Sequence, residues 1–349
     1  MPPLNLYGLT YPALEALLAS WEASPAHARA IWQGLYRHHV THLAEIPELP
    51  AHLRSQLQAQ ATLEIPQHVA SQESRDGSTR KMLLRLADGE QIEVVLLRYR
   101  ARYSACISTQ VGCACGCAFC ATGQLGFVRD LTSAEIVGQV LHCRRELAAC
   151  DASLNNFVLM GMGEPLLNYE NTITALRILL DQRGLGFAPR RVTLSTVGIA
   201  PGIRRLAQEG LKINLAVSLH AATDEVRSQL LPINARYPLD ELFDAIWDYQ
   251  AQTQRRVMFE WTLIAGLTDT PAQATALITR LAGLNAHVNL IRLNPTPDYP
   301  AEPSTPAALE AFAAALDAAG IPHTVRQRRG LHIAAGCGQL RQRAASADC

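Results

Sequence analysis

The sequence has no excess of charge of either sign and few cysteines for its length. Lys plus Arg and Asp plus Glu both number 31 in 349 residues, so nucleic-acid binding would have to use local patches instead of a general positive field. Nine cysteines are too sparse for a disulfide scaffold in so long a chain, and many of them cluster between 106 and 120. That clustering indicates metal chemistry in a reducing cytosol.

Long apolar segments are also missing. The first residues contain no basic segment followed by an apolar run, and no stretch of about 18 apolar residues occurs elsewhere. The sequence has neither an internal repeat nor a low-complexity linker. We therefore expect a soluble, cytoplasmic protein that makes no membrane contact, with one large domain and one small one.

Three cysteines, Cys113, Cys117 and Cys120, form a C-x3-C-x2-C triplet on one short loop. Thiolates suit iron-sulfur centres, and a 4Fe-4S cluster held by three of them leaves one iron open to bind a small molecule. The competing interpretation is a zinc site, which would need a fourth ligand from Cys115, Cys106 or a histidine. The second pair of ligands that zinc sites usually show is not found in this sequence.

The triplet resembles the cluster loop of radical S-adenosylmethionine (SAM) enzymes. They share this spacing and have an aromatic residue just before the last cysteine, as Phe119 is here. The resemblance implies that the open iron binds SAM.

Residues 1–70 are predicted to form a small helical domain. Prolines break the segment into short helices, and Ile31 with Leu35 and Trp32 with Tyr36 are apolar at helical spacing. Several arginines and histidines accompany them. These could make a basic face that binds RNA, or a solvated face with no partner.

Residues 71–98 are predicted to be a β-hairpin connector. Strands at 81–86 and 92–97 are joined by Asp88-Gly89, a typical hairpin turn. Glu93 lies within the second, otherwise apolar strand. It is either on a wet face or held for chemistry, and periodicity does not decide which.

Residues 99–325 show strand-like runs alternating with helical ones, which predicts an α/β fold. Beyond the strand near Cys106, the runs lie at 157–160, 191–195, 213–219, 257–264 and 288–293, and a capping box at Thr132 and Glu135 opens the first helix. Six such units predict a partial (β/α)6 barrel of the TIM type with functional groups at the carboxyl ends of its strands. A partial barrel leaves a lateral opening for a large substrate. Residues 326–349 then form a C-terminal extension that carries Cys337.

Polar residues follow several of these predicted strands. Gly163 would let a ligand approach the backbone, and Glu164 can accept a hydrogen bond from the amino group of a methionine. Taken singly, each polar residue could be an ordinary loop group, but their common location suits the ribose and carboxylate of SAM. The expected SAM-binding residues are Gly163, Glu164, Ser195, Ser218, Leu219, His220 and Asn294.

Seven motifs spread along the chain are CISTQVGC at 106–113, GMGEP at 161–165, LST at 194–196, SLH at 218–220, VNLI at 288–291, NP at 294–295 and CGQL at 337–340. With the helical amino-terminal module, they resemble the RlmN/Cfr family of radical SAM RNA methyltransferases over nearly the whole chain. The resemblance implies one 4Fe-4S cluster per subunit, SAM, and an adenosine of 23S ribosomal RNA as substrate, with transfer RNA as a further substrate of some members. It also implies an electron donor such as flavodoxin or ferredoxin. We expect a monomer.

The resemblance further implies a route through a methylated cysteine. Cys337 takes a methyl group from one SAM, and a second SAM is split at the open iron to a radical that removes hydrogen from this methyl. The resulting carbon radical adds to the adenine and joins protein to RNA. Release then needs a base, which the resemblance assigns to Glu93, and a thiol, Cys106, which leaves a transient Cys106–Cys337 disulfide.

The motifs differ in which adenine carbon they favour. Gly163-Glu-Pro165 is similar to the branch that methylates C2, whereas the segments at 121–123, 289–292 and 294–296 are similar to the branch that methylates C8 and confers antibiotic resistance. The segment before Cys337, residues 332–336, also lacks the acidic residues usual in the family. C2 is favoured and C8 is the alternative. A non-catalytic, zinc-stabilised RNA-binding protein is the alternative from another class.

Overall fold

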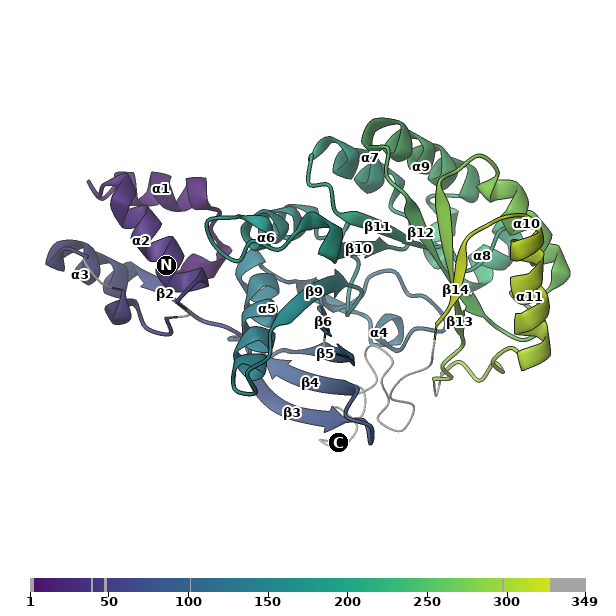
Figure 1. The fold of residues 1–349 in the computed structure, drawn as a ribbon, viewed down its shortest axis with the longest axis horizontal. Coiled ribbons are helices and arrows are strands. Elements are labelled where there is room, and N and C mark those ends of the chain that lie inside the picture. The colour runs from purple at the N-terminus through teal and green to yellow at the C-terminus, as the bar shows by residue number, and fades with distance from the viewer. Residues whose placement is uncertain (1–2, 39, 47–48, 101, 297, 327–349) are drawn as a thin grey trace.

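A mixed β-sheet runs through the protein and curves around a central loop region (Figure 1). The computed structural model describes residues 3–38, 40–46, 49–100, 102–296 and 298–326. Within them the strand order of this sheet is β14-β13-β12-β11-β10-β9-β6-β5-β4-β3. The strands from β6 to β14 are parallel: β6 (Arg102–Cys106), β9 (Leu154–Leu159), β10 (Val192–Thr196), β11 (Asn214–Ser218), β12 (Val257–Leu263), β13 (Ala286–Arg292) and β14 (His323–Val325).

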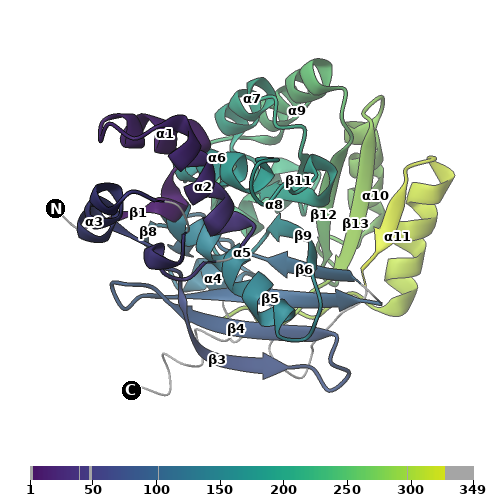
Figure 2. The same cartoon turned by 60° about the vertical axis from the view of Figure 1, so that its left-hand side comes forward.

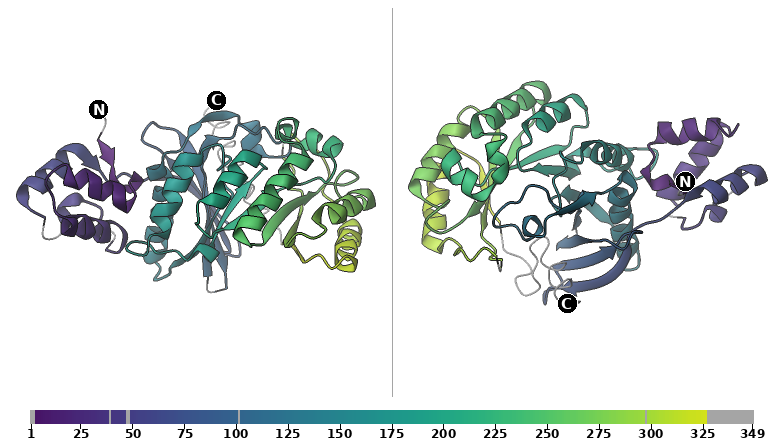
Figure 3. Two further views of the ribbon diagram at one scale, coloured as in Figure 1. Left: turned by 90° about the horizontal axis from the view of Figure 1, so that it is seen from above. Right: turned by 180° about the vertical axis from the view of Figure 1, so that it is seen from behind.

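Helices cover the outer face of the curved sheet, and the short helix α4 (Ala121–Gln124) lies inside the curve (Figure 1 and the right panel of Figure 3). The capping box is formed as predicted: Thr132 Oγ1 accepts from the Glu135 amide, and Glu135 Oε2 accepts from the Thr132 amide. The outer helices are α5 (Ser133–Ala148), α6 (Tyr169–Leu180), α7 (Ala200–Gln208), α8 (Asp224–Leu230), α9 (Leu239–Thr253), α10 (Pro271–Leu281) and α11 (Pro306–Ala318).

Strand β12 shows how the sequence divides the two faces of the sheet. Phe259 and Trp261 are fully buried, and their rings pack on Phe243 of α9 and Phe312 of α11. Side chains alternate across a strand, so Glu260 and Thr262 lie on the inner face. The hydrophobic core is therefore between the sheet and the helices, and polar strand residues are directed into the curve.

The antiparallel half of the sheet contains the predicted hairpin and one strand that the sequence pattern did not reveal. β4 (Thr79–Arg85) pairs with β5 (Gln91–Tyr99), and β3 (Gln67–Glu73) adds an exposed edge strand. β5 also pairs with β6. The hairpin is thus continuous with the parallel strands, and the expected boundary at 98/99 falls inside one sheet.

The amino-terminal helices form a module at one end of the molecule (Figure 2 and the left panel of Figure 3). α1 (Tyr11–Ala19), α2 (Pro25–Tyr36) and α3 (Ala51–Gln60) accompany the paired strands β1 (Leu4–Asn5) and β2 (Ala61–Thr62). The apolar positions predicted at helical spacing, at 31, 32, 35 and 36, are buried. The module contacts α5, where the Ser133 hydroxyl donates to the Gly8 carbonyl.

The remaining elements are short. β7 (Gln110–Gly112) pairs with β8 (Phe127–Asp130), and 3-10 turns lie at Leu6–Gly8, Leu43–Glu45, Pro189–Arg191 and Pro232–Ala235. Among the described segments, no helix combines the length and apolar character that a membrane span needs.

Candidate active site

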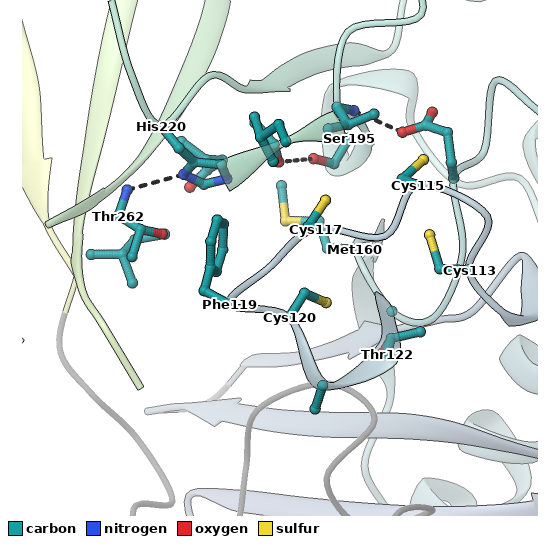
Figure 4. A pocket seen from close by; sticks show the side chains of 18 of the residues that line it. Cys113, Cys115, Cys117, Phe119, Cys120, Thr122, Met160, Ser195, His220 and Thr262 are labelled. Atoms are coloured by element: carbon teal, nitrogen blue, oxygen red, sulfur yellow. Dashed lines mark hydrogen bonds between the residues drawn. The ribbon is translucent and has the colours of Figure 1, made fainter. Parts of the chain in front are cut away.

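A cavity of about 360 Å³ opens at the carboxyl ends of the parallel strands (Figure 4). All three cysteines of the triplet line it. So do most of the residues predicted to bind SAM: Gly163, Glu164, Ser195, Ser218, His220 and Asn294. Residues up to 181 positions apart in the sequence, from 113 to 294, therefore share one space. This is the edge of the sheet where the fold predicts function.

The cysteine loop is held from both sides. The Cys113 amide donates to the Gly126 carbonyl at 2.8 Å, and the Ala118 amide donates to the Leu230 carbonyl at 2.9 Å. Gly112, just before the loop, has a φ of +78°, and a Cβ there would collide with Gly126. Glycine is required at this position because the chain turns in the left-handed region and two backbones nearly touch.

The three thiols are half-buried and gather on the side of the cavity that faces Ser195 and His220 (Figure 4). A hydrogen bond from the Cys115 thiol lowers the pKa of Cys113, whereas burial raises the pKa of Cys117. Among the described residues, no three His, Cys, Asp or Glu side chains lie close enough to hold a single metal ion. Three soft ligands spread along one cavity wall fit a larger iron-sulfur cluster.

Glu164 is anchored on the floor of the cavity by backbone amides. Its Oε2 accepts from the Val197 amide at 2.7 Å, and its Oε1 accepts from the Leu166 amide at 2.9 Å. Burial raises the pKa of the carboxyl to about 7 despite these hydrogen bonds. Gly163 has a φ of +99°, and a Cβ there would overlap Gln110. The loop thus holds a carboxyl group whose charge can change near neutral pH.

His220 presents a neutral imidazole to the cavity. Its Nδ1 accepts from the Thr262 amide at 3.0 Å, which leaves the proton on Nε2. Burial and the charge of Arg227 lower the pKa of His220 to about 3. The Phe119 ring packs edge-on against the imidazole, with 5.0 Å between ring centroids. His220 therefore offers a hydrogen-bond donor without a positive charge.

The two serines lie close together, and the predicted Leu219 differs from its neighbours. Ser195 Oγ and Ser218 Oγ are 3.5 Å apart, so both hydroxyls point into the same space. The Leu219 side chain is fully buried in the hydrophobic core and does not line the cavity. Any contact of Leu219 with a ligand would have to use its backbone.

Comparison with known proteins identifies the family. The model of the radical SAM superfamily matches residues 107–277. The dual-specificity RNA methyltransferase RlmN 1 of Myxococcus xanthus is 53% identical, and the match covers 97% of this chain and 94% of that protein. The chain belongs to the RlmN family of radical SAM RNA methyltransferases. The RlmN protein of Solidesulfovibrio magneticus is 44% identical over 97% of this chain and 96% of its own length.

The fold agrees with this family. The crystal structure of a radical SAM methyltransferase from Sphaerobacter thermophilus superposes with a TM-score of 0.91 and 45% identity, covering 97% of this chain and 99% of that one. The predicted α/β partial barrel is thereby confirmed. The radical SAM superfamily implies a 4Fe-4S cluster and SAM as cofactors, which the cysteine-lined cavity fits.

Sequence reasoning missed Glu260 of this RlmN-family chain. It lies on the inner face of β12, lines the cavity and is 5% exposed. Asn289 Nδ2 donates to its Oε1 at 2.8 Å, and burial raises the pKa of the carboxyl. A signal was available, because Glu260 and Thr262 are the polar positions that alternate with apolar ones in this strand.

Cys106 and Glu93 lie on strands beside the cavity and do not line it. Cys106 ends β6 and is opposite Val95 of β5, two positions from Glu93, so all three share one face of the sheet. Glu93 is 2% exposed, and its Oε2 is 2.8 Å from Nζ of the fully buried Lys81. Glu93 is thus buried in an ion pair and does not face water. Cys337 lies outside the described residues.

Proposed function

We propose that this RNA methyltransferase adds a methyl group to carbon C2 of an adenosine in 23S ribosomal RNA. The relatives named dual-specificity RNA methyltransferase RlmN support an RNA substrate of two kinds, for which transfer RNA is our second candidate. We propose that the enzyme works as a monomer in the cytoplasm and receives electrons from a flavodoxin or ferredoxin. The choice of C2 follows the RlmN names and the Gly163-Glu-Pro165 motif.

The observation that carries the proposal is the shared cavity. A three-cysteine loop, a carboxyl group and a set of hydroxyl, amide and imidazole groups meet in one space at the strand ends. An adenine C–H carbon is too weakly nucleophilic to attack SAM, so its methylation needs the one-electron chemistry that a 4Fe-4S cluster and SAM supply when bound. The cavity offers ligands for both.

We assign the residues that line the cavity to two tasks. Cys113, Cys117 and Cys120 hold the cluster. Glu164 accepts a hydrogen bond from the amino group of SAM, and the Nε2–H of His220 donates to an anionic or carbonyl oxygen. The other residues that we assign to SAM, through side chain or backbone, are Gly163, Ser195, Ser218, Leu219 and Asn294.

We assign the transfer and release of the methyl carbon to Cys337, Cys106 and Glu93. Cys337 carries the methyl from one SAM to the RNA, Glu93 takes the proton from the methylated carbon, and Cys106 displaces the thioether sulfur. The two cysteines then form a disulfide, which requires Cα atoms within about 4.4 to 6.8 Å. Cys106 is at the carboxyl end of β6, on the same sheet edge as the cavity, which supports this role.

The test is anaerobic reconstitution with iron and sulfide, followed by incubation with reductant, SAM and fragments of 23S ribosomal RNA. Mass spectrometry would then examine the digested RNA and the peptide that contains Cys337. We expect 2-methyladenosine and a methylated Cys337. The C8 isomer would overturn the choice of carbon, and a colourless protein with stoichiometric zinc and no SAM cleavage would overturn the enzyme proposal.

Two cysteine variants sharpen this test. Cys106→Ala should still methylate Cys337 but accumulate a covalent protein–RNA species that denaturing gels detect. Cys150→Ala is the matched control, because Cys150 is an exposed thiol outside the cavity. It should behave like the unaltered protein. Normal product release by the Cys106→Ala variant would contradict the role assigned to Cys106.

A further inference from the structure

Arg227 in α8 is a fully buried arginine whose hydrogen bonds within the described residues all reach uncharged oxygens. Nη2 donates to the Val197 carbonyl at 2.6 Å, and Nη1 donates to Asn234 Oδ1 at 2.7 Å. Nε donates to the Leu219 carbonyl at 3.3 Å. The guanidinium thus ties together the loops that follow β10 and β11, which both contribute to the cavity wall.

No carboxylate of the described residues forms an ion pair with Arg227. Asp224 acts on it electrostatically without forming an ion pair, and is also linked to it through Asn234, whose Nδ2 donates to Asp224 Oδ1 at 2.8 Å. Burial lowers the pKa of Arg227 to about 10, so the side chain stays charged at neutral pH. Buried charges in proteins are paired or lie beside metal centres, because an uncompensated one is costly. The protein part of this site therefore leaves a positive charge in need of a negative one.

The cysteine loop lies beside this charge. Leu230, at the end of the same helix, accepts the amide hydrogen of Ala118 at 2.9 Å, and Pro232 lies against Gly116. Arg227 is three residues before Leu230 in α8, about one helical turn from the residue that contacts the loop. Helix α8 therefore places Arg227 near the cysteine loop, although Arg227 does not itself line the cavity.

We propose that Arg227 is the buried counter-charge of the iron-sulfur cluster and raises its reduction potential. The inference rests on the proposed function, because it needs the cluster on Cys113, Cys117 and Cys120. A 4Fe-4S centre with three thiolates is anionic, and it gains one further negative charge when an external reductant donates an electron. The reduced form is stabilised more by a nearby cation, and cluster potentials depend on local charge. Arg227 acts through the cluster and need not touch SAM.

The experiment is a redox titration of the reconstituted holoprotein, in which the electron paramagnetic resonance signal of the reduced cluster is measured at each potential. Arg227→Gln should lower the potential, with about a tenfold change in the ratio of reduced to oxidised cluster, or ~59 mV for one electron. Arg227→Lys keeps the charge and should stay close to the unaltered protein. If Lys shifts the potential as far as Gln does, hydrogen bonding and not charge is responsible, and the proposal fails.

A second variant tests the charge without touching the arginine. Asp224→Asn keeps an oxygen that can accept from Asn234 and removes a carboxylate charge that acts on Arg227. This variant should raise the reduction potential and change the ratio of reduced to oxidised cluster by about twofold. The effect is small because Asp224 is partly exposed and water screens its charge. Opposite shifts in the two variants cannot come from a general loss of stability. If Arg227→Gln does not take up a cluster, the shift in reduction potential of Asp224→Asn decides the question. An unchanged or lowered potential in Asp224→Asn would then overturn the proposal.

Arg280→Gln is the matched control. Arg280 also donates to a carbonyl after β11, that of Ala222 at 3.1 Å, but it is paired with Asp240 at 2.7 Å. Its removal should leave the potential unchanged. A protein that binds no cluster at all would overturn the proposed function. A protein that methylates RNA with the same potential in every variant would overturn only the role of Arg227.

Discussion

In the antiparallel half of the large sheet the buried charges are paired with each other, whereas in the parallel half they surround a cavity. Lys81 and Glu93 form a buried ion pair between β4 and β5. At the ends of the parallel strands, Glu164, Glu260 and Arg227 are also buried, but no ion pair within the described residues includes them. In the first region a buried cation and a buried anion of the protein stabilise each other. The second has buried charged groups, Glu164, Glu260 and Arg227, that a charged ligand can stabilise.

This difference indicates which side of the molecule depends on its cofactors. Buried carboxyl and guanidinium groups without an ionic partner are expensive, and proteins retain them mostly at functional sites. The antiparallel half should hold its arrangement whether or not cluster and SAM are bound. The parallel half should change its stability, its titration behaviour and its affinity for ligands together.

The largest effect is expected where the cavity meets the cluster. Cys117→Ala removes one of three thiolates and should abolish both iron binding and SAM cleavage. Cys115→Ala removes a buried thiol of the same loop that we do not assign as a ligand, and it should retain iron. Iron content and 5'-deoxyadenosine formation are the measurements. Stoichiometric zinc in the unaltered protein that is lost from both variants would show that this loop binds zinc and not an iron-sulfur cluster.

The next effect concerns the buried ion pair of Lys81 and Glu93. Lys81→Met removes the cation 2.8 Å from the buried Glu93 carboxylate and should lower the free energy of unfolding by about 3–5 kcal/mol, because breaking a buried ion pair leaves one charge without the cation that stabilised it. Replacing both residues with Met should restore most of this loss. Urea unfolding of the reconstituted protein measures both. The double variant should still fail to release product, if Glu93 acts as the base.

Arg80→Met is the control for this prediction, since Arg80 precedes Lys81 on the same strand. Its ion pair with Glu146 spans 2.9 Å, but about a third of each side chain is exposed. Such pairs contribute roughly 0–1 kcal/mol. An equal loss of stability from Arg80→Met and Lys81→Met would mean that burial does not distinguish the two halves.

The sequence revealed the parallel half of the fold more fully than the antiparallel half. Apolar runs between helical segments predicted the barrel strands, and the carboxyl-end rule then placed the cavity-lining residues together. β3 was missed because its residues, Gln67–Glu73, are mostly polar and exposed and show no alternation. β14 was missed because it is only three residues long and begins with His323 and Thr324.

Two features of the site depend on long-range geometry that no local pattern reports. The pairing of Lys81 with Glu93 depends on strand register, which puts Lys81 opposite Val95 and thus diagonal to Glu93 on the same face of the hairpin. Arg227 donates to the backbone carbonyl groups of Val197 and Leu219. Because every residue has a carbonyl, the sequence does not show which ones an arginine will contact. Glu260 could have been found, because a carboxyl group in a strand of buried residues is itself unusual.

The smallest predicted effect is a pH dependence that belongs to the parallel half alone. Burial raises the pKa of Glu164 to about 7, so below that pH the carboxyl is protonated before SAM binds. Binding an amino group as a hydrogen-bond donor favours the carboxylate, and the proton must first be released. The affinity for SAM should therefore rise with pH and level off above about pH 7, with a slope of up to tenfold per unit below it. Calorimetric titration of the cluster-loaded protein measures this profile.

Glu164→Gln should bind SAM more weakly and with a flat profile, whereas Glu93→Gln in the antiparallel half should leave the profile as it is. A profile that is flat in the unaltered protein would mean that Glu164 is already charged before SAM binds. The backbone amides of Leu166 and Val197 would then stabilise its carboxylate, as Lys81 stabilises that of Glu93.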